Sequence, residues 1–196
     1  MSLSGKKIAF GITASFCTVQ DILEPLRLLA ATGADIYPVV SPDVFANSSR
    51  FHNRDEFLAE ISKICGRDII STTKAAEPMG PKNPMDIMII APATGNTIAK
   101  IAAGIWDNGL LTAAKAALRN GRPLVLAIFT NDALSQNGVN IMRLYNTKNI
   151  YFVPFGQDDP AAKPTSMAAD LSQIQPTLLA ALSGKQIQPA IIAPPH

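Results

Sequence analysis

The chain has 196 residues, which is enough for one sizeable domain and short for two. Lys and Arg number 17 against 15 Asp and Glu, so the formal charge of +2 is too small to indicate a nucleic-acid-binding or anionic-membrane surface. Hydrophobic residues make up 47% and charged residues 16%, which excludes disorder over most of the chain and indicates that self-association covers some surface.

Two cysteines cannot build a disulfide framework, so we expect a cytoplasmic protein. No segment approaches the ~20 apolar residues of a spanning helix, and we expect no membrane partner. Lys6 and Lys7 before an apolar run mimic a signal peptide, but Phe16 before Cys17 fits no cleavage site. We therefore interpret this run as a buried first strand.

The N-terminal half alternates short apolar runs with helical patterns. Its predicted elements, in chain order, are a strand at Lys7–Ile12, a helix at about Thr18–Ala31, a strand at Asp35–Ser41, a helix from Asn53 to Gly66 and a weak strand at Asp68–Ser71. Pro25 predicts a kink in the first helix. Asn53 with Glu56 three residues later is typical of a helix start.

The C-terminal half continues the alternation. Its predicted elements are a strand at Asp86–Ala91, helices at Thr94–Gly104 and Leu110–Arg119, a strand at Leu124–Phe129, a short helix near Asn140–Tyr145, a strand at Ile150–Val153 and a final helix at Met167–Leu182. The runs at 86–91 and 124–129 lack polar alternation, which predicts strands buried on both faces.

This order of elements predicts an α/β fold: a doubly wound, mostly parallel, six-stranded sheet with helices on both faces, Rossmann-like. We expect residues 1–183 to form a single domain. Residues 184–196 carry three prolines and no helical period, so we expect an extended or disordered tail.

Ligands of such folds bind beyond the carboxyl ends of the strands. After the first strand, Gly11–Ser15 offers small and hydroxyl residues, free N–H groups and a helix N-terminus, which suit a phosphate. The second and third glycines of the dinucleotide fingerprint are absent. An ordinary helix cap explains this segment equally well.

After the strand at 86–91, Pro92-Ala93-Thr94-Gly95-Asn96-Thr97 leads into a helix. Its amide and hydroxyl groups would lie above the sheet, where they can hydrogen-bond the polar edge of a flat heterocycle. Helix capping alone is again an equal alternative.

A resemblance to a known family favours a ligand site over helix capping in both segments. The segment from Pro92 to Asn108 is similar to the PASANT motif of the homo-oligomeric flavin-containing cysteine decarboxylase superfamily, and Gly11–Ser15 resembles the turn that holds the FMN phosphate there. The cofactor implied is FMN, with the phosphate near Ser15 and Ser41 and the isoalloxazine near Asn96. The residues that the resemblance assigns to FMN are Gly11, Thr13, Ala14, Ser15, Ser41, Ala93, Thr94, Asn96 and Asn131.

Three further segments, 76–82, 144–154 and 156–160, resemble the dipicolinate synthase B-subunit family within that superfamily. The resemblance implies an FMN-binding subunit that works with the NAD(P)-dependent A subunit of dipicolinate synthase to oxidise dihydrodipicolinate to dipicolinate in the mother cell of a sporulating bacterium. It also implies a homo-oligomer, a trimer or a dodecamer. Four cations are possible donors to this dicarboxylate, and the sequence does not select among them: Lys100, Arg119, Lys148 and Lys163.

The chain departs from the decarboxylases of the superfamily in two places. They carry a histidine shortly before the strand at 86–91 and a cysteine on a C-terminal lid, whereas residues 77–84 contain no histidine and no cysteine follows Cys65. This disfavours cysteine decarboxylation. The alternatives left open are another flavin-dependent decarboxylase, a flavin prenyltransferase, or a non-catalytic flavin-binding scaffold for the A subunit.

The remaining reactive side chains indicate no further site. We interpret Cys17 as a packed core residue, Cys65 as packing or surface, and His52 as a surface-loop residue. No carboxylate is accompanied by a second cluster of metal ligands, so we expect no metal. The sequence does not identify catalytic residues.

Overall fold

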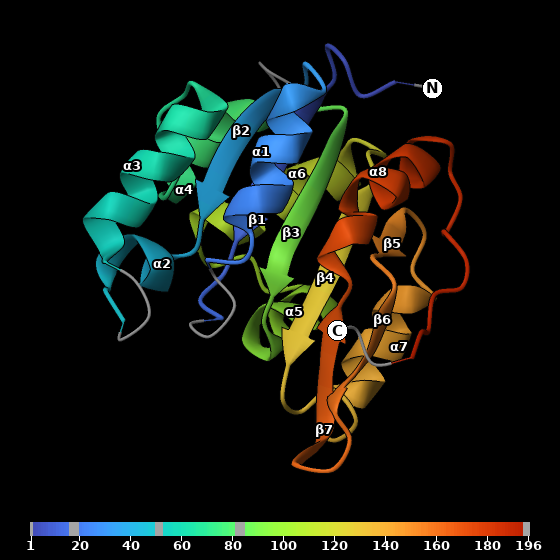
Figure 1. Cartoon of the computed structure of the whole chain (residues 1–196). Coiled ribbons are helices and arrows are strands. Elements are labelled where there is room, and N and C mark those ends of the chain that lie inside the picture. Colours follow the sequence, from blue (N-terminus) through green and yellow to red (C-terminus); the bar gives the residue numbers. More distant parts are fainter. Residues whose placement is uncertain (1, 16–19, 50–52, 81–84, 194–196) are drawn as a thin grey trace.

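The computed structural model describes residues 2–15, 20–49, 53–80 and 85–193 (Figure 1). Its strands are β1 Lys7–Ile12, β2 Asp35–Val40, β3 Ile87–Ala93, β4 Leu124–Thr130, β5 Ile150–Phe152, β6 Phe155–Asp159 and β7 Lys163–Ala169. Its helices are α1 Leu23–Ala31, α2 Pro42–Ala46, α3 Arg54–Cys65, α4 Thr73–Ala76, α5 Gly95–Ala103, α6 Gly109–Arg119, α7 Gly138–Tyr145 and α8 Ile174–Leu182, with 3-10 turns η1 Glu77–Met79 and η2 Leu171–Gln173.

The strands form one sheet in the order β2-β1-β3-β4-β7-β6, and β5 also pairs with β4. The pairs among β2, β1, β3, β4 and β5 are all parallel, while β7 runs antiparallel to β4 and to β6. In Figure 1, α1 and α8 lie in front of the sheet and α6 lies behind it. The predicted doubly wound, mostly parallel α/β fold is therefore confirmed, with seven strands in place of six.

The core follows the predicted pattern of burial. All seven residues of β3 are buried, because this strand lies between β1 and β4 and is covered on both faces. The first five residues of β4 are buried as well. Continuous apolar runs therefore lie at the centre of the sheet.

The predicted ends of α3 are confirmed. The Asn53 side chain accepts hydrogen bonds from the backbone N–H groups of Asp55 and Glu56, and Gly66 ends the helix with a left-handed φ of 62°. Helix α1 begins only at Leu23, so Pro25 lies in its first turn, where no hydrogen bond is lost. The kink predicted at Pro25 is therefore wrong; residues 18–19 lie outside the described residues.

Two predicted elements need correction. The expected strand at Asp68–Ser71 contributes only a single bridge, between Ile70 and Val39. The expected helix at Met167–Leu182 begins at Ile174, because residues 163–169 pair with β4 and β6 as β7. The antiparallel β6–β7 hairpin was not predicted from the sequence.

The chain after α8 is extended along the sheet. The Gln186 side chain donates to the Phe152 carbonyl and accepts from its N–H, both at 2.8 Å. Farther on, the N–H of Phe155 donates to the carbonyl of Ala190, and the N–H of Ile192 donates to the carbonyl of Phe155. Within the described ranges, no helix is long and apolar enough to cross a membrane.

Candidate functional site

The turn after β1 and the turn after β3 are joined by one buried side chain. The Thr13 hydroxyl donates to the carbonyl oxygen of Pro92 at 2.7 Å, and it accepts from the backbone N–H of Thr94 at 3.1 Å. Thr13 is only 1% exposed. These bonds fix the two turns side by side at the carboxyl edge of the sheet, where the topology places a ligand site.

A cavity of about 260 Å³ opens beside this junction. The residues that line it are Thr13, Ala14, Ser41, Pro42, Asp43, Thr94, Asn96, Thr97, Lys100, Asp107 and Asn108. They come from the turns after β1, β2 and β3, from the start of α2, from α5 and from the segment just before α6. We call this cavity the β2-side cavity.

Ser41 supplies the clearest sign of a ligand. It stands at the N-cap of α2, where a serine usually accepts a hydrogen bond from its own helix, but its side chain makes no such bond. Its Oγ is buried and has no hydrogen-bond partner among the described residues. A buried hydroxyl is costly to leave unpaired, so this atom indicates a partner that arrives with a ligand.

Helix α5 points its first turn at the same cavity. Thr94 is its N-cap and makes no side-chain cap bond to the helix backbone. The leading N–H groups of a helix lack partners within it and attract negative charge. Farther along the same helix, Lys100 Nζ donates to Asp107 Oδ2 at 2.7 Å, and this bond lowers the pKa of the Asp107 carboxyl.

A second cavity of about 480 Å³ lies on the other side of Ala14 and Thr94. We call it the hairpin-side cavity, because the β6–β7 hairpin forms one wall. The residues that line it are Ala14, Ser15, Thr94, Phe129, Thr130, Asn131, Asp158, Lys163, Ser166, Met167 and Ala168. The two cavities share Ala14 and Thr94, so they lie next to each other.

A polar network supports the turn between β4 and α7. The Asp132 carboxylate accepts from Thr130 Oγ1 at 2.6 Å and from Asn137 Nδ2 at 2.8 Å. These three side chains pack on Gly95, where an added Cβ would lie 2.6 Å from Thr130 Oγ1. This network was not predicted from the sequence, because no local motif links Asp132, Asn137 and Gly95.

Seven of the nine residues that the resemblance assigned to FMN line these cavities. Thr13, Ala14, Ser41, Thr94 and Asn96 line the β2-side cavity, and Ala14, Ser15, Thr94 and Asn131 line the hairpin-side cavity.

The other two are packed inside the sheet. Ala93 is fully buried in β3. A Cβ on Gly11 would lie 3.1 Å from Ile90 Cγ1 and 3.3 Å from Leu110 Cδ1, so Gly11 allows close packing of β1. Neither residue lines either cavity.

The remaining reactive groups lie elsewhere. Cys65 packs partly buried against the core, and burial raises its pKa to about 12. Cys17 and His52 lie outside the described residues. Within the described part of the chain, no group of three or more His, Cys, Asp or Glu side chains could hold a metal ion.

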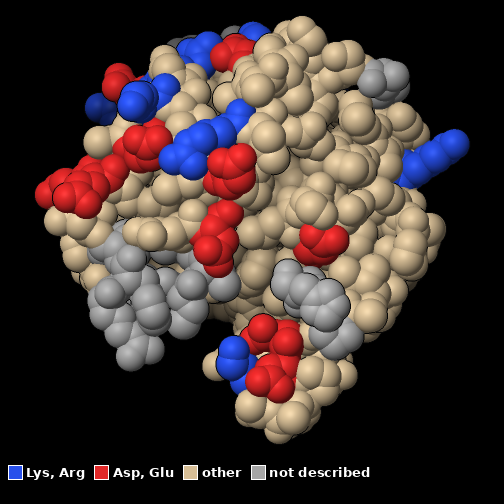
Figure 2. All heavy atoms as spheres, in the orientation of Figure 1, with Lys and Arg blue, Asp and Glu red and all other residues tan. Residues whose placement is uncertain are grey.

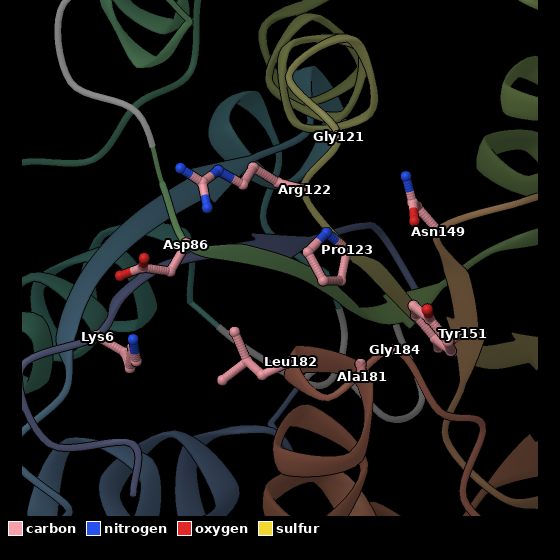
Figure 3. Close-up of a pocket in the computed structure, with 10 residues that line it drawn as sticks. All are labelled: Lys6, Asp86, Gly121, Arg122, Pro123, Asn149, Tyr151, Ala181, Leu182 and Gly184. Carbon is pink, nitrogen blue, oxygen red and sulfur yellow. The ribbon is translucent and has the colours of Figure 1, made fainter. Parts of the chain in front are cut away.

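A further hollow of about 330 Å³ lies at the opposite, amino-terminal edge of the sheet. Lys6, Asp86 and Arg122 lie on one side of it, and Asn149 and Tyr151 lie on the other (Figure 3). This hollow carries charges of both signs. It lies at the edge of the sheet opposite the turns after β1 and β3, so it is separate from the candidate site.

The whole chain matches known proteins. The Flavoprotein family model matches residues 1–180. The dipicolinate synthase B subunit of Bacillus subtilis (strain 168) is 46% identical over 97% of this chain and 96% of its own length. The crystal structure of the dipicolinate synthase B subunit from Bacillus halodurans C matches with a TM-score of 0.91 and 45% identity, over 99% of this chain and 100% of that one.

A more distant structure shares the fold. The dodecameric FMN-dependent UbiX-like decarboxylase from Escherichia coli O157:H7 matches with a TM-score of 0.57 and 22% identity, over 76% of this chain and 79% of that one. The chain therefore belongs to the Flavoprotein family and, within it, to the family of dipicolinate synthase B subunits.

Proposed function

We propose that the chain binds one FMN across the two joined cavities, with the phosphate in the β2-side cavity and the isoalloxazine ring toward the hairpin-side cavity. The observation that carries this proposal is the buried, unpartnered Oγ of Ser41. A phosphate would supply its missing partner and would lie near the first turn of α5. Asn96 is exposed and lines only the β2-side cavity, so in this pose its amide faces the phosphate end of FMN, not the isoalloxazine that the resemblance assigned to it.

We further propose that the chain is the B subunit of a dipicolinate synthase, which oxidises dihydrodipicolinate with an NAD(P)-dependent A subunit. The name and 46% identity of the Bacillus subtilis relative support this. A bound flavin supplies a two-electron acceptor. Gly11–Ser15 lacks the second and third glycines of the dinucleotide fingerprint, so we assign the nicotinamide site to the A subunit.

In this function the residues of the chain act mainly by positioning. Thr13 holds the two turns together, and the Asp132 network holds Thr130 and Asn131 at the wall of the hairpin-side cavity. Loss of two hydrogens from the substrate yields an aromatic ring, so orientation contributes more to the rate than a strong base.

We also propose that the chain self-associates through α7. Val139, Met142 and Tyr145 recur every three residues along one face of this helix, and they are 74%, 53% and 37% exposed. Exposed apolar stripes of this kind are typical of contacts between protomers. The dodecameric state of the Escherichia coli decarboxylase supports a homo-oligomer.

The test is turnover of dihydrodipicolinate by the complex of both subunits with wild-type chain, Asn96→Ala or the control Asn120→Ala. Asn120 is exposed at the C-terminal end of α6, outside both cavities. We expect Asn96→Ala to lower turnover about tenfold, the scale of one lost hydrogen bond, with the complex intact. Unchanged turnover in Asn96→Ala would favour the non-catalytic scaffold.

A further inference from the structure

The structure distinguishes the four cations that the sequence left equivalent. Lys163 lines the hairpin-side cavity and Lys100 lines the β2-side cavity, whereas Arg119 and Lys148 line neither. Lys100 is held by Asp107 beside the space proposed for the phosphate. Lys163 is thus the cation in the cavity proposed for the isoalloxazine, against which the substrate must lie to be oxidised by the flavin.

Lys163 is positioned by a hairpin that is bonded to the site. The Thr165 hydroxyl donates to the carbonyl of Asn131 at 2.6 Å, and β7 pairs with the end of β4. At the hairpin tip, the Asp159 carboxylate accepts from the N–H groups of Ala161 and Ala162, which fixes the turn just before Lys163. The hairpin is therefore an ordered wall of the cavity.

Lys163 is paired with a partner that an anion can displace. Its Nζ donates to Asp158 Oδ2 at 2.8 Å, and the Ser166 hydroxyl lies 3.3 Å from the same oxygen. The two charged side chains are 58% and 37% exposed, and ion pairs of such exposure are weak. Figure 2 shows charged side chains of both signs gathered over the tip of the hairpin, at the lower end of the view.

We propose that Lys163 and Ser166 form a carboxylate-binding subsite, in which a carboxylate of the pyridine dicarboxylate takes the place of Asp158 as their acceptor. Phe129 and Met167 supply apolar surface for the ring in the same cavity. This inference rests on the proposed function, since it names the group that recognises that substrate. The Asp158 carboxylate competes with the substrate and disfavours uncharged ligands that cannot displace it.

The test measures binding of dipicolinate and of picolinate, which lacks one carboxylate, by titration calorimetry in chelator-treated buffer. The variants are Lys163→Ala, Lys163→Arg, Asp158→Asn, Lys100→Ala and the exposed control Lys148→Ala. Each protein is measured with and without FMN, and its FMN retention and thermal unfolding are recorded separately.

We expect Lys163→Ala to weaken dipicolinate binding about tenfold, equivalent to about 1.4 kcal/mol, and to reduce the preference for dipicolinate over picolinate, because the single carboxylate of picolinate can bind at the other end of the site. Lys163→Arg retains the preference, and Asp158→Asn tightens dipicolinate binding, by up to about fivefold, because the competing carboxylate is gone. Opposite effects of Lys163→Ala and Asp158→Asn are not produced by simple loss of the hairpin structure, which would weaken binding in both.

Two results would overturn the subsite. The first is that Lys163→Ala binds dipicolinate as tightly as wild type does. The second is that Lys100→Ala loses the preference for dipicolinate over picolinate while Lys163→Ala keeps it. If the wild type retains no FMN yet binds dipicolinate through Lys163, the subsite stands and the flavin proposal fails. The two proposals are therefore tested separately.

Discussion

The hydroxyl of Ser41 is buried at the end of β2 and has no partner among the described residues. We predict that Ser41→Ala does not destabilise the protein without FMN, and that it raises the free energy of unfolding by up to about 1 kcal/mol, because an unsatisfied polar group is removed. Urea unfolding measures this, with the exposed Ser4→Ala, before β1, as the control. A clear loss of stability in Ser41→Ala alone would mean that the hydroxyl is bonded within the chain.

The burial of Cys65 predicts how fast its thiol reacts. Burial raises the pKa of its thiol from 9.0 to about 12, so only a minute fraction is thiolate at neutral pH. In a Cys17→Ala background, we expect alkylation of the folded protein at pH 8 to be about a thousandfold slower than in urea, because three pKa units change the thiolate fraction by that factor. The rate for the folded protein should rise about tenfold per pH unit and keep rising above pH 9, where the rate for the unfolded protein levels off. Fast labelling of the folded protein at neutral pH would contradict this account.

At the scale of elements, α5 meets the β4–α7 turn at Gly95. A methyl group there would lie 2.6 Å from Thr130 Oγ1, 2.7 Å from Asn137 Nδ2 and 2.8 Å from Asp132 Oδ1. We predict that Gly95→Ala lowers the free energy of unfolding, because overpacking costs about 1–3 kcal/mol and the alanine gains at most about 1 kcal/mol of helix propensity.

A double-mutant cycle with Asn137→Ala tests whether this contact is the cause. We expect Gly95→Ala to cost less in the Asn137→Ala background, because one of the crowded atoms is gone. If the two substitutions change the free energy of unfolding additively, the contact with Asn137 is not the cause of the strain.

The parallel part of the sheet was predictable because its signals are local. The uninterrupted apolar run of β3 and the Asn53 and Gly66 ends of α3 each follow from a few adjacent residues. The β6–β7 hairpin was not predictable in this way. Met167–Ala169 is as compatible with a helix as with a strand, and only its pairing with β4 and β6 decides between them.

The candidate site also has a part that was predictable from the sequence and a part that was not. The turns after β1 and β3 were found from hydroxyl and small residues that follow apolar strands, and the structure brings them together through Thr13. The Asp132 network and the placement of Lys163 depend on contacts between residues far apart in the sequence. Spacing along the chain carries no signal for such contacts.

At the scale of the whole molecule, the exposed apolar face of α7 predicts the state of assembly. We expect Met142→Glu to reduce the molecular mass in solution, measured by light scattering, because a charge in an apolar interface is costly to bury. The thermal unfolding of the protomer should change little, since Met142 is 53% exposed within one protomer. The control Lys148→Glu, beyond the end of α7, should leave the mass unchanged. A wild-type protein that is already a monomer would contradict the self-association.

The central proposal is that one FMN binds across the two cavities that share Ala14 and Thr94, and FMN titration of the purified chain tests this most directly. The change in the visible flavin spectrum reports binding, with wild type, Ser41→Ala and Ser4→Ala compared side by side. We predict that wild type and Ser4→Ala retain FMN equally and that Ser41→Ala binds it about tenfold more weakly, the cost of one hydrogen bond to a charged phosphate. A wild-type chain that never retains FMN, or equal affinity in Ser41→Ala, would contradict the account.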